Sequence, residues 1–447
     1  MEKKADYTYQ SGIGNLHSSE ALPGALPIGQ NSPQKCPLGL YAEQLSGSSF
    51  TAPRESNRRS WLYRIRPSVM HSRFTPLAED TAPQFCGDFK GLSTDPNQMR
   101  WFPLPLPPPI AEGSSETPQS DFVTGLLTMA GSGEAGGINH SGLSILMYSC
   151  NVSMTNRAMS NADGEMLIVP QIGTLDIQTE MGRLLVKPNE ICVIPRGVRF
   201  SVKVDSPSRG YILEVFGGQF KLPELGPIGS NGLANARDFF YPVAAFEDID
   251  LPDGGFEIVN KFGGRLFSCK LNHSPFDVVA WHGNLAPFKY DLSRFNVINT
   301  VSYDHPDPSI FTVLTCSSES APGVALADFV IFPPRWMVAE NTFRPPYFHR
   351  NVMTEFMGMI WGKYDAKVGF QAGGASLHSC MSPHGPDEAT FTAASAATLA
   401  PRKFEEGLAF MFETNQLLKL TKFALDAPHR DVGYQKSWQT MPKLFKQ

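Results

Sequence analysis

The segment Gly142-Leu-Ser-Ile-Leu-Met-Tyr-Ser149 opens the series of short apolar runs that decides the fold. Such runs recur at short intervals, separated by Gly, Pro and Asn, as is typical of strands in a β-sandwich or barrel. Five more follow in the first half of the chain, at residues 165–170, 173–179, 183–187, 190–195 and 211–216. The sequence therefore predicts a jelly-roll-like core here.

A second series of apolar runs predicts another β-rich unit towards the C-terminus. It comprises residues 295–301, 310–314, 328–333, 355–360 and 407–413. We expect a mainly β protein made of two jelly-roll-like sandwich halves, residues 1–285 with an extended N-terminal arm and residues 286–447. The one convincing helix is predicted at residues 386–398, because Pro386 precedes it and Asp387 and Glu388 complement the dipole of its first turn.

Composition excludes several classes of function. The net charge is -5 and 18% of the 447 residues are charged, with no long basic run, so we expect no nucleic-acid partner. The N-terminus is too polar for a signal peptide, and the apolar stretches are too short to span a membrane. Seven scattered cysteines without a C-x-x-C pair argue against a disulfide framework, so we expect a soluble protein of the reducing cytoplasm.

The stretch Phe343-Arg-Pro-Pro-Tyr-Phe-His349-Arg-Asn-Val-Met-Thr-Glu355 places a histidine and a glutamate six residues apart, and His384 follows downstream. On a strand, an even spacing puts His349 and Glu355 on the same face. Two imidazoles and one carboxylate predict a metal site. The alternative is that His349 is a satisfied core histidine and Glu355 a surface residue, in which case the surrounding aromatic residues form the inner face of a sandwich.

A His, Glu, His set on one side of a metal leaves the other coordination positions open, as in non-haem Fe(II) oxygenases. An oxygenase is therefore the first hypothesis. A 2-oxoglutarate-dependent hydroxylase is a second, disfavoured because that class uses a tight H-x-D/E spacing. A third is a non-catalytic storage or binding protein whose strands carry no open metal site.

Several long segments resemble the homogentisate 1,2-dioxygenase family over nearly the whole chain. They include Asn57-Arg-Arg-Ser-Trp-Leu-Tyr-Arg-Ile65, Leu225-Gly-Pro-Ile-Gly-Ser-Asn-Gly-Leu-Ala-Asn235, Val279-Ala-Trp-His-Gly-Asn284 and Phe329-Val-Ile-Phe-Pro-Pro-Arg-Trp336. The resemblance implies cupin-like halves, the second of which, residues 286–447, carries an iron site. It also implies ring cleavage of homogentisate by O2 to give 4-maleylacetoacetate, in tyrosine and phenylalanine catabolism.

The resemblance further implies roles for individual residues. His349, Glu355 and His384 would hold Fe(II), His305 would be the catalytic acid or base, and Tyr364 and His378 would contact substrate together with His384. It suggests a homohexamer built as a dimer of trimers. The sequence leaves open whether Tyr347 and Phe348 shape the pocket or pack the strand, and whether His282 has more than a structural role.

Overall fold

The computed structural model describes residues 6–29, 35–110, 117–135, 141–224, 232–297, 308–319, 321, 323–337 and 347–447. Strands dominate these ranges, which contain just two α-helices, α1 (Glu388–Ala396) and α2 (Lys422–Asp426). The predicted mainly β class with few helices is confirmed. Neither of these described helices has the length and apolar character needed to cross a membrane.

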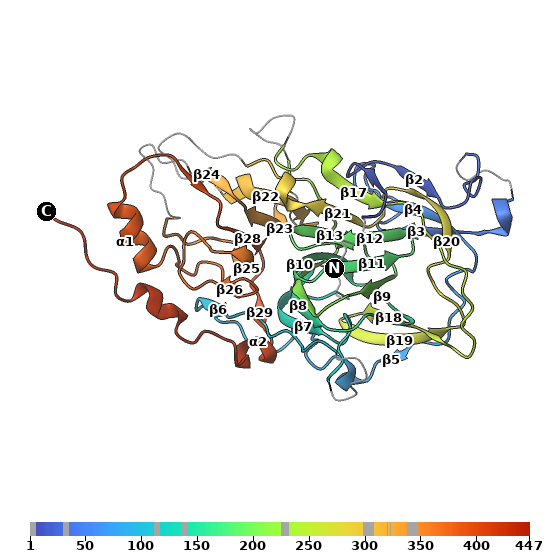
Figure 1. Cartoon of the computed structure of the whole chain (residues 1–447), viewed down its shortest axis with the longest axis horizontal. Coiled ribbons are helices and arrows are strands. Elements are labelled where there is room, and N and C mark those ends of the chain that lie inside the picture. The colour runs from blue at the N-terminus through green and yellow to red at the C-terminus, as the bar shows by residue number, and fades with distance from the viewer. Residues whose placement is uncertain are drawn as a thin grey trace.

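A nine-stranded sheet forms the middle of the molecule (Figure 1). Its strands, in spatial order, are β1 (Tyr9–Ser11), β17 (Phe239–Pro242), β21 (Phe288–Asp291), β13 (Glu190–Ile194), β10 (Gly164–Ile172), β15 (Ser208–Phe216), β8 (Gly142–Cys150), β7 (Leu126–Gly133) and β29 (Lys419–Leu420).

Two further sheets belong to the N-terminal half. The larger has seven strands in the order β12 (Gly182–Val186), β11 (Leu175–Thr179), β14 (Phe200–Lys203), β9 (Arg157–Asn161), β18 (Phe256–Phe262), β19 (Arg265–Leu271) and β5 (Thr75–Pro76). The smaller has four, in the order β2 (His17–Glu20), β20 (Val278–Gly283), β4 (Arg59–Arg64) and β3 (Tyr41–Ser46).

The C-terminal half is built on another seven-stranded sheet, which we call the C-terminal sheet. Its order is β16 (Phe220–Lys221), β22 (Thr312–Ser317), β23 (Ala325–Phe332), β28 (Gly407–Thr414), β25 (Thr354–Gly362), β26 (Ala375–His378) and β6 (Met99–Trp101). A short pair, β24 (Arg335–Met337) and β27 (Arg402–Phe404), lies beside it.

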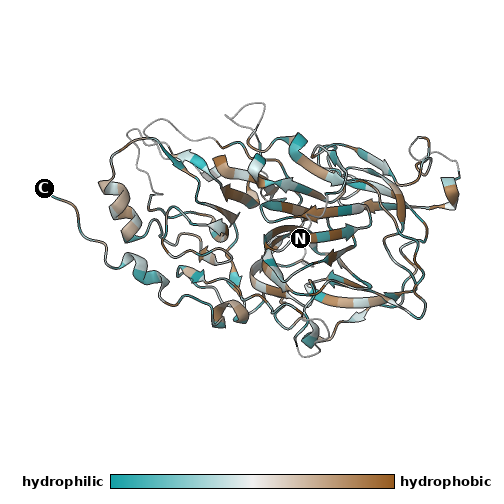
Figure 2. Cartoon of the chain, viewed as in Figure 1, coloured by the Kyte–Doolittle hydropathy of each residue, from teal (hydrophilic) through white to brown (hydrophobic). Residues whose placement is uncertain are grey.

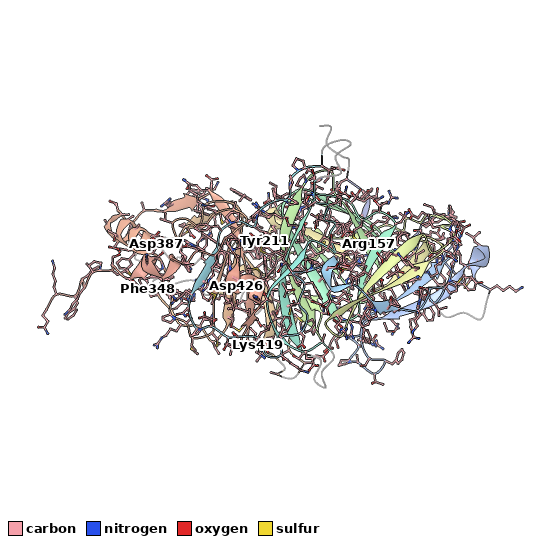
Figure 3. All side chains as sticks on the ribbon, turned by 90° about the horizontal axis from the view of Figure 1, so that it is seen from below. Arg157, Tyr211, Phe348, Asp387, Lys419 and Asp426 are labelled. Carbon is pink, nitrogen blue, oxygen red and sulfur yellow. The ribbon has the colours of Figure 1, made fainter. Side chains whose placement is uncertain are left out.

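The central strands of the nine-stranded sheet are covered on both faces. Strand β8 is buried along almost its whole length, which explains why its sequence is mainly apolar on both faces. Tyr148 packs against Phe122, which in turn contacts Phe200 of the N-terminal seven-stranded sheet. Tyr211, one residue beyond the partner of Tyr148, lies on the opposite face and packs against Phe410 of the C-terminal sheet. Figure 3 labels Tyr211 in the middle of the molecule.

Apolar residues are concentrated along these strands (Figure 2). A large core cluster accordingly runs from the N-terminal sheets through the middle sheet to the C-terminal sheet, and includes Leu184, Ile212 and Phe412. The two halves therefore pack as one body around the nine-stranded sheet.

The two halves also exchange strands. Strands β6 and β16, from the first half of the chain, complete the C-terminal sheet, while β29, near the C-terminus, pairs with β7 in the middle sheet. Backbone hydrogen bonds thus join the halves. The predicted domain boundary between residues 285 and 286 remains a prediction.

Most of the predicted runs form strands, with two differences. The run at residues 310–314 becomes strand only from Thr312, because residues before it form a 3-10 turn at Pro308–Phe311. The strand predicted at residues 295–301 is wrong over residues 295–297, which are irregular. The rest of that range lies outside the described residues. The predicted helix is confirmed as α1, whose N-cap Asp387 accepts a hydrogen bond from the backbone N–H of Thr390.

Candidate metal centre

Three residues from separate pieces of backbone build the candidate centre. Glu355 is the second residue of β25, where it is 5% exposed. His349 precedes that strand and His384 follows β26 in the chain. The two histidines pair as an isolated antiparallel bridge: His349 N–H donates to His384 O at 2.9 Å, and His384 N–H donates to His349 O at 3.1 Å. This bridge sets the two imidazoles side by side over the carboxylate.

The predicted continuous strand from His349 to Glu355 is wrong. A bend separates the bridge at His349 from the start of β25 at Thr354. Asn351 shapes it: its side-chain oxygen accepts from Met353 N–H, and its Nδ2 donates to Glu355 Oε1 at 3.1 Å and to Glu413 Oε1 at 2.9 Å. His349 and Glu355 meet because the chain turns back, and the role of Asn351 was not foreseen from the sequence.

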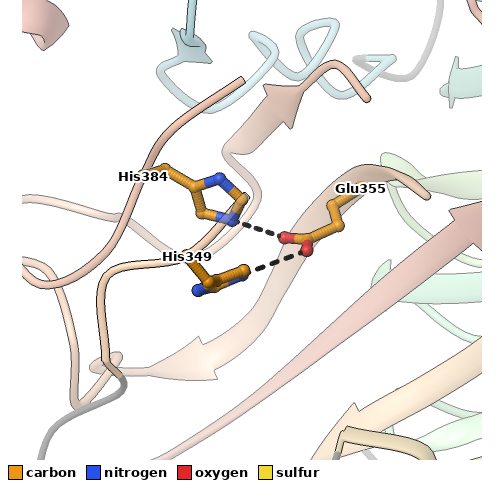
Figure 4. A group of neighbouring side chains, drawn as sticks. All are labelled: His349, Glu355 and His384. Carbon is orange, nitrogen blue, oxygen red and sulfur yellow. Dashed lines mark hydrogen bonds and ion pairs between the residues drawn. The ribbon is translucent and has the colours of Figure 1, made fainter. Parts of the chain in front are cut away.

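The side-chain geometry is compact (Figure 4). One potential ligand atom from each of His349, Glu355 and His384 lies within 4.8 Å of the others. His349 Nε2 is 3.3 Å from Glu355 Oε1, and His384 Nε2 is 2.9 Å from Glu355 Oε2. The predicted ligand set is therefore brought together.

The hydrogen-bond partners of the imidazoles fit a bound cation. His349 Nδ1 lies 3.0 Å from Tyr347 O, and His384 Nδ1 lies 2.9 Å from Ser382 O. A carbonyl oxygen only accepts, so each Nδ1 carries the hydrogen and a neutral ring keeps its lone pair on Nε2. Both Nε2 atoms then face an ionised carboxylate, and three acceptors directed at one point require a positive centre between them. Backbone carbonyls that orient metal-binding imidazoles in this way are usual at metal sites.

The pKa shifts of Glu355 and His349 agree with an ionised carboxylate at this centre. Burial alone would raise the pKa of Glu355, but the neighbouring imidazoles of His349, His378 and His384 hold that pKa well below its ordinary value. The hydrogen bond with Glu355 raises the pKa of His349, against the opposing effect of burial. The carboxylate is thus ionised, and without a metal a proton on His349 compensates part of its charge.

His378 lies next to this group. It is the cross-strand partner of Glu355 on β26, its Nδ1 is 3.8 Å from Glu355 Oε2, and its ring stacks on His384 with centroids 4.1 Å apart. Burial, then the nearby Lys367, lowers the pKa of His378 well below its ordinary value, so the ring is neutral. The expected substrate contact at His378 therefore sits at the centre.

The side chains around His378 come from segments that the sequence did not single out. Its Nε2 is 3.2 Å from Lys367 Nζ and 2.9 Å from Tyr434 Oη. Burial lowers the pKa of Lys367 to about 8, so its ammonium form still predominates at pH 7. Burial raises the pKa of Tyr434, which stays a phenol. A lone lysine and a tyrosine near the C-terminus carry no motif that could have identified them.

The other expected site residues are placed less directly. Tyr364 follows β25 and packs edge-on against Phe332 and Phe370, and burial followed by the charge of Asp365 raises its pKa well above the ordinary value. His305 lies outside the described residues.

The flanking aromatic residues divide their roles. The ring of Tyr347 meets His349 edge-on at 5.4 Å, whereas Phe348 is 45% exposed and contacts Phe391 of α1. His282, on β20, interacts through Nε2 with Tyr63 Oη at 3.2 Å, a structural contact on a different sheet. Tyr347 thus borders the candidate centre and Phe348 packs against the helix that follows it.

Comparison with known proteins adds the family. Two family models, described as homogentisate 1,2-dioxygenase N-terminal and C-terminal, match residues 8–292 and 293–445. Curated homogentisate 1,2-dioxygenases are similar over their whole lengths. The Drosophila melanogaster protein is 57% identical and the match covers 99% of each chain, the Dictyostelium discoideum protein is 57% identical with 98% of each covered, and the Caenorhabditis elegans protein is 56% identical with 100% of this chain and 99% of its own covered. On this full-length agreement, the chain belongs to the homogentisate 1,2-dioxygenase family.

Proposed function

We propose that this chain cleaves the aromatic ring of homogentisate with O2 to give 4-maleylacetoacetate, using Fe(II) held by His349, Glu355 and His384. The observation that carries the proposal is the convergence of these three ligands at one partly buried point in a chain of this family. The mixed nitrogen and oxygen donor set suits a ferrous ion.

The charges of the site suit an anionic substrate. Two neutral imidazoles and one carboxylate leave a net positive charge on a divalent ion. Bound iron would supply that positive charge and open positions for a phenolic oxygen and for dioxygen. The buried ammonium of Lys367 adds a second positive charge near the centre. A substrate that carries both an ionisable phenol and a carboxylate is therefore favoured there.

The chain's own residues then bind and orient the ring. We propose that His305 exchanges the phenolic proton, since its ordinary pKa lies near neutrality, and that Tyr364, His378 and His384 contact the substrate. Orientation matters greatly because a misplacement of about 1 Å can cost on the order of a hundredfold in rate. The hydroxylase alternative would need 2-oxoglutarate as a co-substrate, and a storage protein would need no metal.

We also propose a cytoplasmic homohexamer assembled as a dimer of trimers. The assembly is the one that the resemblance to this family implies, and the seven cysteines, none of which forms a disulfide in the structure, fit a reducing compartment. Mass measurement of the native purified protein tests the subunit number.

The function is tested by loading the purified protein with Fe(II) under anaerobic conditions and then adding homogentisate and O2. We expect one O2 consumed per homogentisate and the ultraviolet absorbance of the ring-opened product. Absence of new absorbance in iron-loaded protein would overturn the proposal. Oxygen uptake that required 2-oxoglutarate would instead favour the hydroxylase.

The metal ligands are tested by His349→Ala with His282→Ala as the matched control. Both histidines are partly buried and hydrogen-bonded, but only His349 lies at the centre. We expect iron content to fall in the first variant and to stay near the wild-type level in the second. Equal iron content in both would contradict the assigned ligands.

For His305→Phe we expect iron to be retained while turnover is largely lost, and loss of iron would mean that His305 is a ligand.

A further inference from the structure

His378 lies where a fourth metal ligand could lie, yet it is not one of the three assigned ligands. The structure shows a physical reason for this. It is 1% exposed, stacks on His384 with ring planes 8° apart, and directs Nδ1 towards Glu355 Oε2 at 3.8 Å. Its Nδ1 is a buried polar atom without a hydrogen-bond partner among the described residues. A third imidazole nitrogen thus faces the same small volume as the ligand set.

The other ring nitrogen of His378 determines what Nδ1 can do. Nε2 faces Lys367 Nζ at 3.2 Å and Tyr434 Oη at 2.9 Å. An ammonium group can only donate, whereas a phenol can donate or accept, so the ammonium decides the role of Nε2. Nε2 must therefore present its lone pair to Lys367, which in a neutral imidazole leaves the hydrogen on Nδ1. A protonated Nδ1 cannot bind a metal, but it can donate a hydrogen bond.

Tyr434 is fixed from outside the centre, so its position is not incidental. It begins a 3-10 turn (Tyr434–Trp438), and the guanidinium of Arg100 lies 4.6 Å over its ring. Arg100 in turn pairs with Asp431 at 2.6 Å. The indole N–H of Trp438 donates to Pro386 O at 3.1 Å, two residues beyond His384. The C-terminal segment is thereby anchored to the loop that carries His384.

Lys367, like Tyr434, is held in place by its surroundings. Its side chain is buried, and in the described part of the chain no carboxylate lies within 4.0 Å of its ammonium. The neighbouring backbone is tied to the N-cap of α1: Val368 N–H donates to Asp387 Oδ2 at 2.5 Å, and Asp387 N–H donates to Ala366 O at 3.3 Å. Its ammonium therefore has His378 as its close side-chain partner.

We infer that Lys367 and Tyr434 are positioning residues that hold His378 as an Nδ1–H donor facing the centre, so that it hydrogen-bonds an oxygen there and does not become a fourth metal ligand. The bonded oxygen would belong to Glu355 in the resting site and to the substrate when it is present. This inference rests on the proposed function and names two residues in it that act through His378.

The arrangement protects the open coordination positions. If Nδ1 lost its hydrogen, its lone pair could bind a metal. His378 would then occupy a coordination position that substrate or dioxygen needs. Partners that orient a histidine at a metal site are typically worth about 10–100-fold in activity or metal affinity. Lys367 and Tyr434 would thus maintain reactivity without touching the metal.

The test compares Lys367→Met and Tyr434→Phe with the wild type, since both changes conserve volume and remove only the donor. In the copper(II)-substituted proteins, pulsed EPR counts the coordinated imidazoles. We expect two in the wild type and a third imidazole in Lys367→Met, which disappears again in Lys367→Met/His378→Phe. With Fe(II), we expect kcat to fall about 10–100-fold in Lys367→Met, with a smaller fall in Tyr434→Phe.

Two matched controls remove the same groups elsewhere. Lys363→Met deletes an exposed ammonium, and Tyr148→Phe deletes a buried hydroxyl that has no hydrogen-bond partner in the described structure. Both should keep two imidazoles and wild-type kcat. An unchanged imidazole count and unchanged kcat in Lys367→Met would overturn the inference, as would a loss limited to thermal stability.

The outcome is separable from that of the proposed function. If the wild type fails to consume homogentisate, the proposed function fails, but the imidazole count still decides the state of His378. Three imidazoles in the wild type would overturn the inference even if homogentisate is consumed.

Discussion

Replacing Asp387 by alanine should loosen helix α1 and, with it, the loop that carries His384. Asp387 is 7% exposed and its carboxylate has two backbone partners: Oδ1 accepts from Thr390 N–H at 2.8 Å and Oδ2 accepts from Val368 N–H at 2.5 Å. Helix α1 has only nine residues and buries none of them. So short a helix is unstable by itself, and its cap and this tether should provide much of its stability.

The magnitude follows from the two hydrogen bonds. Loss of an N-cap costs about 1 kcal/mol, and loss of a hydrogen bond from a buried carboxylate costs about 2 kcal/mol. Together the local free energy of opening α1 should fall by roughly 3 kcal/mol, which corresponds to about a hundredfold increase in its open population.

Hydrogen–deuterium exchange measures this directly, because the amide protons of α1 exchange through local opening. We expect exchange at residues 391–396 to accelerate up to about a hundredfold in Asp387→Ala. Metal should also dissociate faster, since Asp387 is three residues from His384 in the chain.

Asp291→Ala is the matched control. Asp291 caps a different short helix, Leu292–Arg294, by accepting from Ser293 N–H, and it lies outside the centre. This variant should leave exchange in α1 and metal release unchanged. If Asp387→Ala changes exchange in α1 by less than about threefold, the argument that the cap and tether hold this helix is refuted.

Three further outcomes are expected. Glu355→Gln removes the negative charge between His349 and His384, so metal affinity should fall by more than about tenfold in a chelator competition; undiminished affinity would contradict the centre. The raised pKa of His349 stabilises the metal-free fold below pH 6.5, and this contribution is lost as pH rises through that pKa. Because metal must displace that proton, affinity should weaken about tenfold per pH unit on acidification below the raised pKa; a flat profile from pH 7 to 5 would count against it. Burial raises the pKa of Glu165 from 4.5 to about 7, so unfolding in urea should show a loss of roughly 3 kcal/mol as pH rises through this range. Glu165→Gln should abolish that loss, and an identical pH dependence in both proteins would show that Glu165 is not responsible.

The sequence by itself determined the strands and the helix, because these depend on neighbouring residues. Apolar runs bounded by turn residues predicted β8, β10, β13 and β15, and Pro386 with Asp387 predicted α1. The types of the three ligands also followed from the chain, since only a few side chains bind a metal.

Local pattern failed where the chain bends. The spacing of His349 and Glu355 was consistent with one strand, yet the side chains meet through a turn held by Asn351. Both arrangements bring the residues together, so spacing could not distinguish between them. The direction of a short polar segment is set by its hydrogen-bond partners, and one of these, Glu413, is more than fifty residues away.

Tertiary structure alone decided the surroundings of the centre. Lys367 and Tyr434 are sixty-seven residues apart and meet at one nitrogen of His378 because the C-terminal segment packs against the loop that carries His384. Neither residue belongs to a periodic pattern or a spaced motif. A proton's position on an imidazole depends on which donors face its two nitrogens, and that depends on packing between distant segments, which a linear pattern does not contain.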